Sequence, residues 1–327
     1  MHKNITRTIH FLAAGLAAIT LLVGSPGQAA DYPSKTIHIV VPWKAGGGTD
    51  AIGRGFAEAL KGVVNVSVVV DNISGAGGVT GSIKVAKSRA DGHTLLMNGT
   101  TDITAALTFK DVPLSLDDFT YIGGFFTSPT WILSHTDRKY TTLQDFLDKA
   151  KANPGKLTVG TAGPSGAQML MAAAIKGNTG INFHIIPYSG GKDLKKALIG
   201  NQVDAGIIHA PVLLAEAKEG LIKVIATGMP LDKITYEPLR STKTLKDAGI
   251  PIEIGITRGI YVPKSTPSKV VAELSKLVEK AAKSDAFAKF GKKFGFAPVW
   301  VPGSDFEAQI RAELALFKDI KTKHIDK

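Results

Sequence analysis

The sequence predicts an α/β protein with two successive sets of strands and helices and a helical C-terminal segment. Short apolar runs alternate with amphipathic runs along most of the chain. Such alternation favours right-handed crossovers and mostly parallel sheets flanked by helices. The 327 residues are enough for two domains, at about 150 residues each. No Gly-, Pro- or Ser-rich linker separates the two sets, so we expect crossing strands to join them.

Residues 1–29 predict a secretory signal peptide. Lys3 and Arg7 make the N-terminal region positively charged, and an uncharged apolar run covers 11–23. Gly27-Gln28-Ala29 then places small residues before a cleavage site. The apolar run is shorter than the roughly 20 residues that span a bilayer. Because no cysteine follows, no lipid attachment site exists, and we expect a free periplasmic product. The alternative is an uncleaved N-terminal anchor.

The first set of elements begins after the signal peptide. A helix is predicted over 50–60, where apolar residues recur at i, i+4 and i+8. A glycine turn and a short helix precede Asp91-Gly92, and the pattern over 100–121 is irregular. The predicted strands of this set are 36–41, 66–70 and 94–97.

The second set begins near residue 130 with a helix that ends at Pro154-Gly155, and Thr141 and Gln144 fit a capping box at its start. Further helices follow the glycine turns near residues 163 and 190. The predicted strands are 157–161, 183–187, 203–209, 223–227 and 256–262. The predicted C-terminal helices are 268–283, 285–294 and 304–320.

Composition excludes several functions. The chain has no cysteine, and therefore no disulfide, thiolate zinc site, iron–sulfur cluster or cysteine nucleophile. Without the signal peptide, 37 basic and 28 acidic residues remain. A basic balance suits nucleic acid, an anionic surface or an anionic ligand, and the export signal argues against nucleic acid.

Three glycine-rich corners follow predicted strands: Pro42–Asp50, Ser74–Gly81 and Thr161–Gln168. In open α/β sheets, ligands bind at the carboxyl ends of strands, where helix N-termini favour anions. None of the corners has the Gly-Lys-Ser/Thr of a P-loop. The corner at Gly75 has Thr80 where a dinucleotide fingerprint needs its third glycine. We therefore expect an anion site without a nucleotide.

The sequence predicts no catalytic or metal-binding residue and no cofactor. None of the histidines after the signal peptide has a metal-ligand spacing, and Gly163-Pro164-Ser165-Gly166 is not a nucleophile elbow. His209, at the end of a predicted strand, stays a candidate site residue. The alternative function is a secreted α/β enzyme that acts on a small anionic substrate.

Five segments in order resemble the Bug-type periplasmic solute-binding proteins of tripartite tricarboxylate transporters. The resemblance covers nearly all of the chain after the signal peptide. The matching segments are Tyr32–Asp50, Val68–Leu96, Thr161–Gln168, Ile186–Asp204 and Val262–Ser275.

The resemblance implies a two-lobed periplasmic-binding-protein (Venus-flytrap) fold, each lobe a mostly parallel sheet flanked by helices. Lobe 1 would be 30–130 plus 251–327, and lobe 2 would be 131–250. It also implies a monomeric, non-enzymatic protein that binds a small carboxylate in the cleft. Family members bind dicarboxylates, tricarboxylates, acidic amino acids or aromatic acids. The implied partner is the set of permease subunits of a tripartite tricarboxylate transporter.

The family's two clasping loops map onto the first and third glycine corners. Backbone N–H groups of Gly46, Gly47 and Gly48 would hold one carboxylate. From lobe 2, the implied residues are Thr161, Gly163, Ser165, Gly166, Gln168 and Tyr188. Asp50 would fix its own loop and helix, a role that reverses if the ligand carries an ammonium. Gly47 would tolerate a β-branched side chain badly if its φ is positive.

Four positions depart from the family pattern or carry charge near the crossing. Trp43 would stack on a flat ligand or wall the cleft. Lys44 would neutralise a second carboxylate or point to solvent. Arg258 is a candidate charge partner, and His209 stands where family members are commonly apolar or acidic. These positions leave the identity of the carboxylate open.

Overall fold

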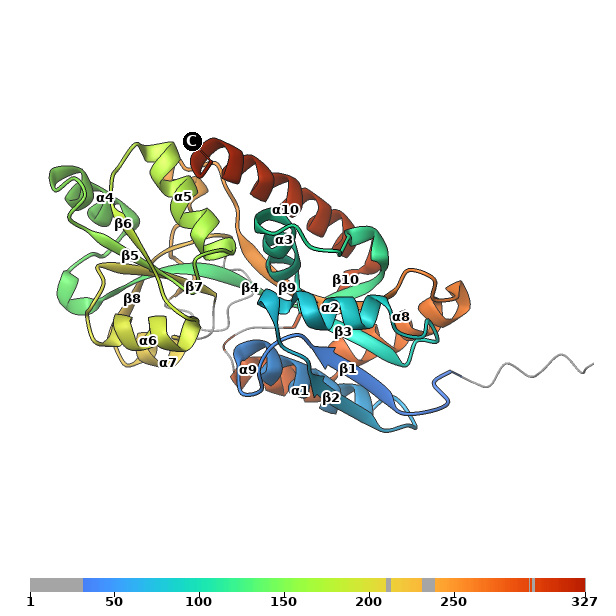
Figure 1. Ribbon diagram of the computed structural model, residues 1–327. Helices are drawn as coiled ribbons and strands as arrows, with labels where there is room; N and C mark the ends of the chain where they lie inside the picture. The colour runs from blue at the N-terminus through green and yellow to red at the C-terminus, as the bar shows by residue number, and fades with distance from the viewer. Residues whose placement is uncertain (1–31, 210–212, 231–238, 294, 296–297, 327) are drawn as a thin grey trace, which may run out of the picture.

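The computed structural model describes residues 32–209, 213–230, 239–293, 295 and 298–326. The predicted signal peptide lies outside the described residues. Two α/β lobes lie side by side, and α10 (Gly303–His324) extends along both (Figure 1). Their strands form one sheet in the order β2-β1-β3-β9-β4-β7-β5-β6, with β10 and β8 also paired to β4. None of the helices in the described ranges has the length and apolar character needed to cross a membrane.

The strands are β1 (Ile37–Val41), β2 (Val68–Asn72), β3 (Thr94–Gly99), β4 (Phe119–His135), β5 (Thr158–Thr161), β6 (His184–Pro187), β7 (Ala205–His209), β8 (Ile222–Thr227), β9 (Gly255–Pro263) and β10 (Val301–Pro302). Besides α10, the α-helices are α1 (Gly48–Lys61), α2 (Val79–Ala86), α3 (Thr100–Phe109), α4 (Leu143–Ala152), α5 (Ala167–Thr179), α6 (Gly191–Ile199), α7 (Leu214–Lys218), α8 (Ser268–Ala282) and α9 (Asp285–Lys293).

Strand β4 is shared by both lobes. Its residues 119–129 pair with β9, and its residues 130–135 pair with β7 and β8. All of these pairings are antiparallel, whereas the outer strands of each lobe pair in parallel, as the strand–helix alternation predicts. The sheet is therefore parallel toward its two edges and antiparallel where the chain crosses between the lobes.

Helices cover both faces of the sheet in each lobe. On one face of the first lobe, Phe56 of α1 and Phe287 of α9 pack on Phe125 of β4, and the Phe56 and Phe125 rings stack at 3.9 Å. On the opposite face, α2, α3 and the start of α10 cover the sheet. In the second lobe, α6 and α7 cover one face and α4 and α5 the other. The apolar residues predicted to repeat along α1 are buried in this core.

Helix α10 contributes to the cores of both lobes. Phe306 and Ile310 pack in the core of the first lobe, and Phe317 and Ile320 pack in that of the second. Between them, the Glu313 carboxylate accepts hydrogen bonds from Thr100 Oγ1 at 3.0 Å and Thr104 Oγ1 at 2.5 Å. The helix is thus fixed to α3 midway along its length.

The sequence predicted no strand over β4, and two of the predictions on local structure were wrong. Residues 100–109 form the regular helix α3, which the sequence analysis treated as irregular. Threonines and apolar residues are both buried along most of α3, so the helix has no clear polar face to produce an amphipathic pattern. The capping box of α4 uses Thr142 and Asp145 instead of Thr141 and Gln144, because Asp145 accepts from both threonine N–H groups.

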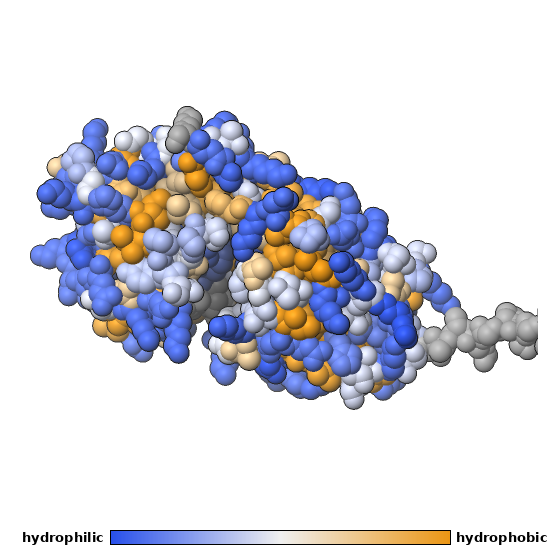
Figure 2. Space-filling view, in the orientation of Figure 1, coloured by the Kyte–Doolittle hydropathy of each residue, from blue (hydrophilic) through white to orange (hydrophobic). Residues whose placement is uncertain are grey.

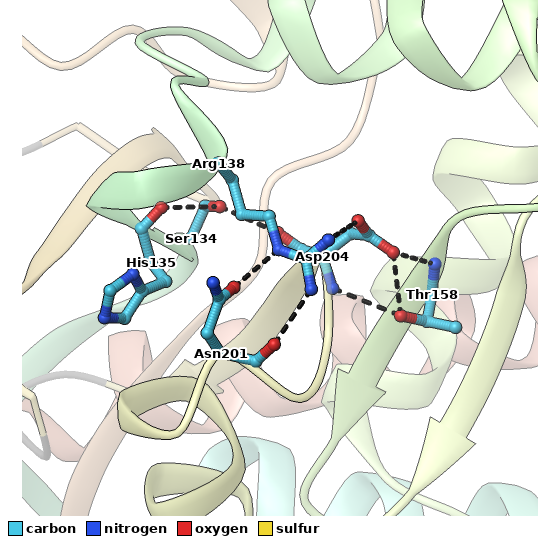
Figure 3. Close-up of polar contacts among 6 residues, drawn as sticks. All are labelled: Ser134, His135, Arg138, Thr158, Asn201 and Asp204. Atoms are coloured by element: carbon cyan, nitrogen blue, oxygen red, sulfur yellow. Dashed lines mark hydrogen bonds and ion pairs between the residues drawn. The ribbon is translucent and has the colours of Figure 1, made fainter.

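A polar network closes the end of the second lobe (Figure 3). Arg138 Nη1 lies 2.8 Å from Asp204 Oδ1, and its Nε and Nη2 donate to the side chain and carbonyl of Asn201. The other Asp204 oxygen accepts from the N–H and hydroxyl of Thr158, both at 2.9 Å. Ser134 Oγ donates to the Asp204 carbonyl at 2.7 Å. The network joins the ends of β4, β5 and β7.

We predict that Asp204→Ala lowers the free energy of unfolding by about 1–3 kcal/mol, because it leaves Arg138 and Thr158 without their acceptor. Urea unfolding followed by circular dichroism measures this. Asp319→Ala, which removes an exposed i,i+4 pair with Lys323, is the control and should cost less than about 1 kcal/mol. Equal effects of the two substitutions would contradict a structural role for the network.

Candidate functional site

A cavity of about 590 Å³ lies between the two lobes and is lined by residues of both. Figure 2 shows a hollow between the lobes on this face. Most of the site residues proposed from the sequence line it: Trp43, Lys44, Gly47, Gly48, Ser165, Gly166, Gln168, His209 and Arg258. The others, which are not among its lining residues, are Gly46, Asp50, Thr161, Gly163 and Tyr188.

Three helices begin at this cavity. The first residue of each lines it: Gly48 of α1, Ala167 of α5 and Gly191 of α6. The N–H groups of a first helical turn have no partner within the helix, and the helix dipole makes this end partially positive. One helix comes from the first lobe and two from the second, so backbone donors surround the cavity from opposite sides. This arrangement favours an anion.

The Pro42–Asp50 loop is held by Asp50, whose carboxylate is 3% exposed. It accepts from Gly46 N at 2.8 Å and Asn72 Nδ2 at 2.9 Å, and it pairs with Arg54. Burial opposes ionisation, but hydrogen bonds from Arg54, Gly46 and Asn72 keep the pKa of Asp50 below its usual value. Asp50 therefore shapes the loop, as the sequence analysis expected, and lies behind the cavity wall.

Position 46 is the one in this loop whose backbone conformation favours glycine. Its φ is 82°, in the left-handed region. Gly47 has φ −81° and ψ 169°, which other residues adopt without strain. Because the φ of Gly47 is not positive, its backbone conformation gives no reason to expect that a β-branched side chain is badly tolerated there. The Gly46 conformation directs its N–H toward Asp50, which leaves Gly47 and Gly48 to line the cavity.

The facing loop of the second lobe has the same construction. Thr161 is buried and donates through Oγ1 to the Gly163 carbonyl at 2.9 Å. Gly166, with φ 142°, precedes the first turn of α5. Tyr188 N donates to the Thr161 carbonyl at 2.8 Å, which holds the end of β6 beside this loop. Thr161, Gly163 and Tyr188 thus support the loop, while Ser165, Gly166 and Gln168 line the cavity.

Arg258 of β9 places a buried positive charge at the cavity wall. The side chain is 6% exposed, and its Nη2 donates to Thr49 Oγ1 at a long 3.4 Å. Nε and Nη1 are buried and have no hydrogen-bond partner among the described residues. A buried cation with unused donors is costly unless an anion compensates it. Lys44 also lines the cavity, as does Lys110, whose Nζ donates to the Ala76 carbonyl.

His209 joins the two lobes at the cavity. Its Nδ1 lies 2.9 Å from Thr130 Oγ1, and its Nε2 lies 3.4 Å from Thr101 Oγ1 of α3. Burial, and then the charge of Arg258, lowers the pKa of His209 to about 3. The ring is therefore neutral at physiological pH and offers one donor and one acceptor.

Sequence reasoning missed two parts of the wall. Asp102 lines the cavity from the first turn of α3, which was not predicted as a helix. Gly75, Gly77 and Gly78 line it, with Gly78 beside the Trp43 ring, although the sequence had indicated only a structural role for Gly77 and Gly78. The available sequence signal for Asp102 was Gly99, which follows the predicted strand 94–97 as the glycines of the other corners follow their predicted strands. Among the described residues, no group of three His, Asp or Glu could hold a metal ion.

The two-lobed fold and its anion-suited cleft define a solute-binding protein. A model of the family described as tripartite tricarboxylate transporter family receptor matches residues 52–324, and the chain belongs to this family. A UPF0065 protein of Bordetella pertussis is 29% identical over 88% of this chain and 89% of its own length. The protein BugT of the same organism is 27% identical over 90% of each.

Solved structures show the same fold. A TctC solute-binding protein from Polaromonas is 28% identical, with a TM-score of 0.76 over 89% of this chain and 99% of that one. The periplasmic binding protein BugD is 26% identical, with a TM-score of 0.75 over 89% and 98%. An R. palustris protein solved with adipate is 25% identical, with a TM-score of 0.78 over 90% and 98%. The fold class inferred from the resemblance is confirmed.

We predict that His209 makes the protein less stable in acid. An unfolded histidine protonates near pH 6.5, whereas this ring protonates near pH 3 when folded. Between these values the unfolded state binds the extra proton, so the free energy of unfolding falls as pH decreases from about 6.5, by up to about 1.4 kcal/mol per pH unit. Urea unfolding at several pH values measures the slope, which His209→Asn should reduce. Ring ¹⁵N shifts that titrate near pH 6.5 in the folded protein would contradict it.

Proposed function

We propose that the protein captures a small organic di- or tricarboxylate in the cleft between its lobes. The observation that carries this proposal is Arg258, a buried guanidinium with two unpartnered nitrogens at a cavity that three helix N-termini also line. A carboxylate would accept hydrogen bonds from the free guanidinium nitrogens and from the N–H groups at the helix N-termini. The adipate in the R. palustris structure supports this chemical class.

Binding is coupled to closure of the lobes. The loops around Gly47 and Gly166 belong to different lobes, and both line the cavity. A ligand that contacts both loops binds the closed state better than the open one, and it shifts the equilibrium by that difference in affinity. The lobes are residues 30–130 with 251–327, and residues 131–250.

The protein acts outside the cytoplasm as a monomeric receptor. It delivers its ligand to the membrane permease subunits of a tripartite tricarboxylate transporter, in line with the family to which it belongs. The receptor releases the acid chemically unchanged, and no residue has a catalytic role. Conversion of a bound acid to a product by the metal-free protein would favour the alternative, a secreted enzyme.

A thermal-shift screen against mono-, di- and tricarboxylates tests the proposal. Ligand at 100 times its Kd should add about 2.7 kcal/mol to stability. Arg258→Met should weaken binding of the best acid by about 30-fold or more, because the buried partner of its carboxylate is lost.

Arg311→Met is the matched control. Arg311 lies on α10, where it pairs with Asp117 and Glu307, and its loss should leave the affinity unchanged. A screen in which no carboxylate raises the melting temperature would refute carboxylate capture. Unchanged affinity in Arg258→Met would remove Arg258 from the site.

We predict cleavage of the signal peptide after Ala29 or Ala30, because small residues there follow a short apolar run. N-terminal sequencing of protein from the periplasmic fraction identifies the cut. Intact protein that begins at Met1 in the membrane fraction would instead show that the segment is an uncleaved anchor.

A further inference from the structure

We infer that Asp102 selects carboxylates that carry a hydrogen-bond donor, an amine or a hydroxyl, on the carbon beside the carboxylate. This inference rests on the proposed function, since it names the acids that the same cleft prefers. It assigns to Asp102 the role of acceptor for the ligand's donor, next to the positive charge of Arg258.

The fold brings Asp102 and Arg258 to one part of the cavity wall. Strand β3 ends at Gly99, which is the antiparallel partner of Arg258 in β9. Helix α3 starts directly after Gly99, and Asp102 lies in its first turn. A Cβ placed on Gly99 would lie 2.8 Å from Asp102 Oδ2. The carboxylate therefore folds back over the residue that pairs with Arg258, and both side chains line the cavity.

The charges of Asp102 and Arg258 attract each other, but the two side chains form no hydrogen bond. In the described part of the chain, no direct ion pair joins Asp102 and Arg258, and Asp102 Oδ2 is shielded from solvent without a hydrogen-bond donor. Arg258 likewise keeps two unpartnered nitrogens. Buried polar atoms are normally paired, and unpaired ones call for an explanation such as a missing ligand. Here an unused acceptor and unused donors lie at one cavity.

The charge state makes Asp102 an acceptor. Burial raises the pKa of Asp102 to about 6, against the opposing charge of Arg258 and hydrogen bonding from the Gly99 N–H and the Trp43 side chain. The carboxyl is therefore mostly ionised at neutral pH, and Oδ2 is the oxygen left without a partner. The titratable and charged groups that share the cavity are Lys44, Lys110, His209 and Arg258. His209 is neutral at that pH.

An acid without a neighbouring donor therefore fits this wall poorly. Its carboxylate would gain from Arg258 but would meet the like charge of Asp102 with no hydrogen to place between them. An ammonium or hydroxyl on the adjacent carbon supplies that hydrogen and fills the vacant acceptor. An ammonium also supplies a compensating charge, so we expect the order amine, then hydroxyl, then unsubstituted acid.

The test compares acids with one carbon skeleton that differ only at carbon 2. Succinate, malate and aspartate form the four-carbon set, and glutarate, 2-hydroxyglutarate and glutamate form the five-carbon set. Isothermal titration calorimetry at pH 7.5 measures each affinity. Wild type should bind the preferred substituted acid at least about tenfold more tightly than its unsubstituted counterpart, the gain expected of a charge-assisted hydrogen bond.

Asp102→Asn keeps the shape of the side chain and removes its charge, so the advantage of the amine over the unsubstituted acid should collapse. Asp102→Ala removes the acceptor and should also remove the advantage of the hydroxyl. Asp148→Asn on α4, where Asp148 accepts from Gln144, removes the same charge elsewhere and should leave every ratio unchanged. Because the readout is a ratio between acids, a general loss of stability does not imitate the effect.

The outcomes separate this inference from the proposed function. Substituted and unsubstituted acids that bind wild type equally would overturn the selectivity and leave carboxylate capture intact. A preference that persists in both Asp102 variants would remove Asp102 as its source. Failure of every acid to bind wild type would overturn the proposed function and this inference together. If a variant does not fold, the preference of the wild-type protein for substituted over unsubstituted acids still tests the selectivity.

Discussion

The pairing of β4 with β9 determines where the cleft lies and what charges it contains. Residues 119–129 of β4 run antiparallel to the whole of β9 and then continue into the second lobe. Arg258 is therefore carried by a central strand, where both of its backbone neighbours are in the same sheet. The topology thus places a guanidinium with two unpartnered nitrogens at the cavity wall.

Under the proposed function, both neutral backbone N–H groups and the buried cation Arg258 would bind the ligand. The loops around Gly47 and Gly166 present N–H groups that suit many anions. Arg258, Lys44 and Asp102 add point charges that differ in burial and sign. Under the proposed function, the backbone donors of the loops would accept many acids, and the point charges would make one member of the family distinguish among them. Changes at a few wall positions would then alter the ligand without altering the fold.

Local sequence patterns predicted the outer strands, helix α1 and both glycine loops, because each is a short element with its own periodicity or turn chemistry. Arg258 and His209 were proposed from a resemblance and from a strand end, and both line the cavity. Helix α3 was missed because burial on nearly all sides removes the polar face that periodicity detects. The site residue on it, Asp102, was missed with it. The pairing of Gly99 with Arg258 is a contact between distant segments, which no local pattern encodes.

In the closure that we propose, helix α10 would limit the path along which the lobes move. Its first half is packed in the first lobe, its second half in the other, and Glu313 binds α3 between them. A straight rod anchored on both sides resists bending, so rotation must pivot beside it and sweep through a small arc. Points far from the rod travel farthest in such a rotation, while the Thr100–Glu313 contact hardly shifts. In the closure that we propose, the stiffness of α10 would therefore limit how far one lobe can rotate toward the other.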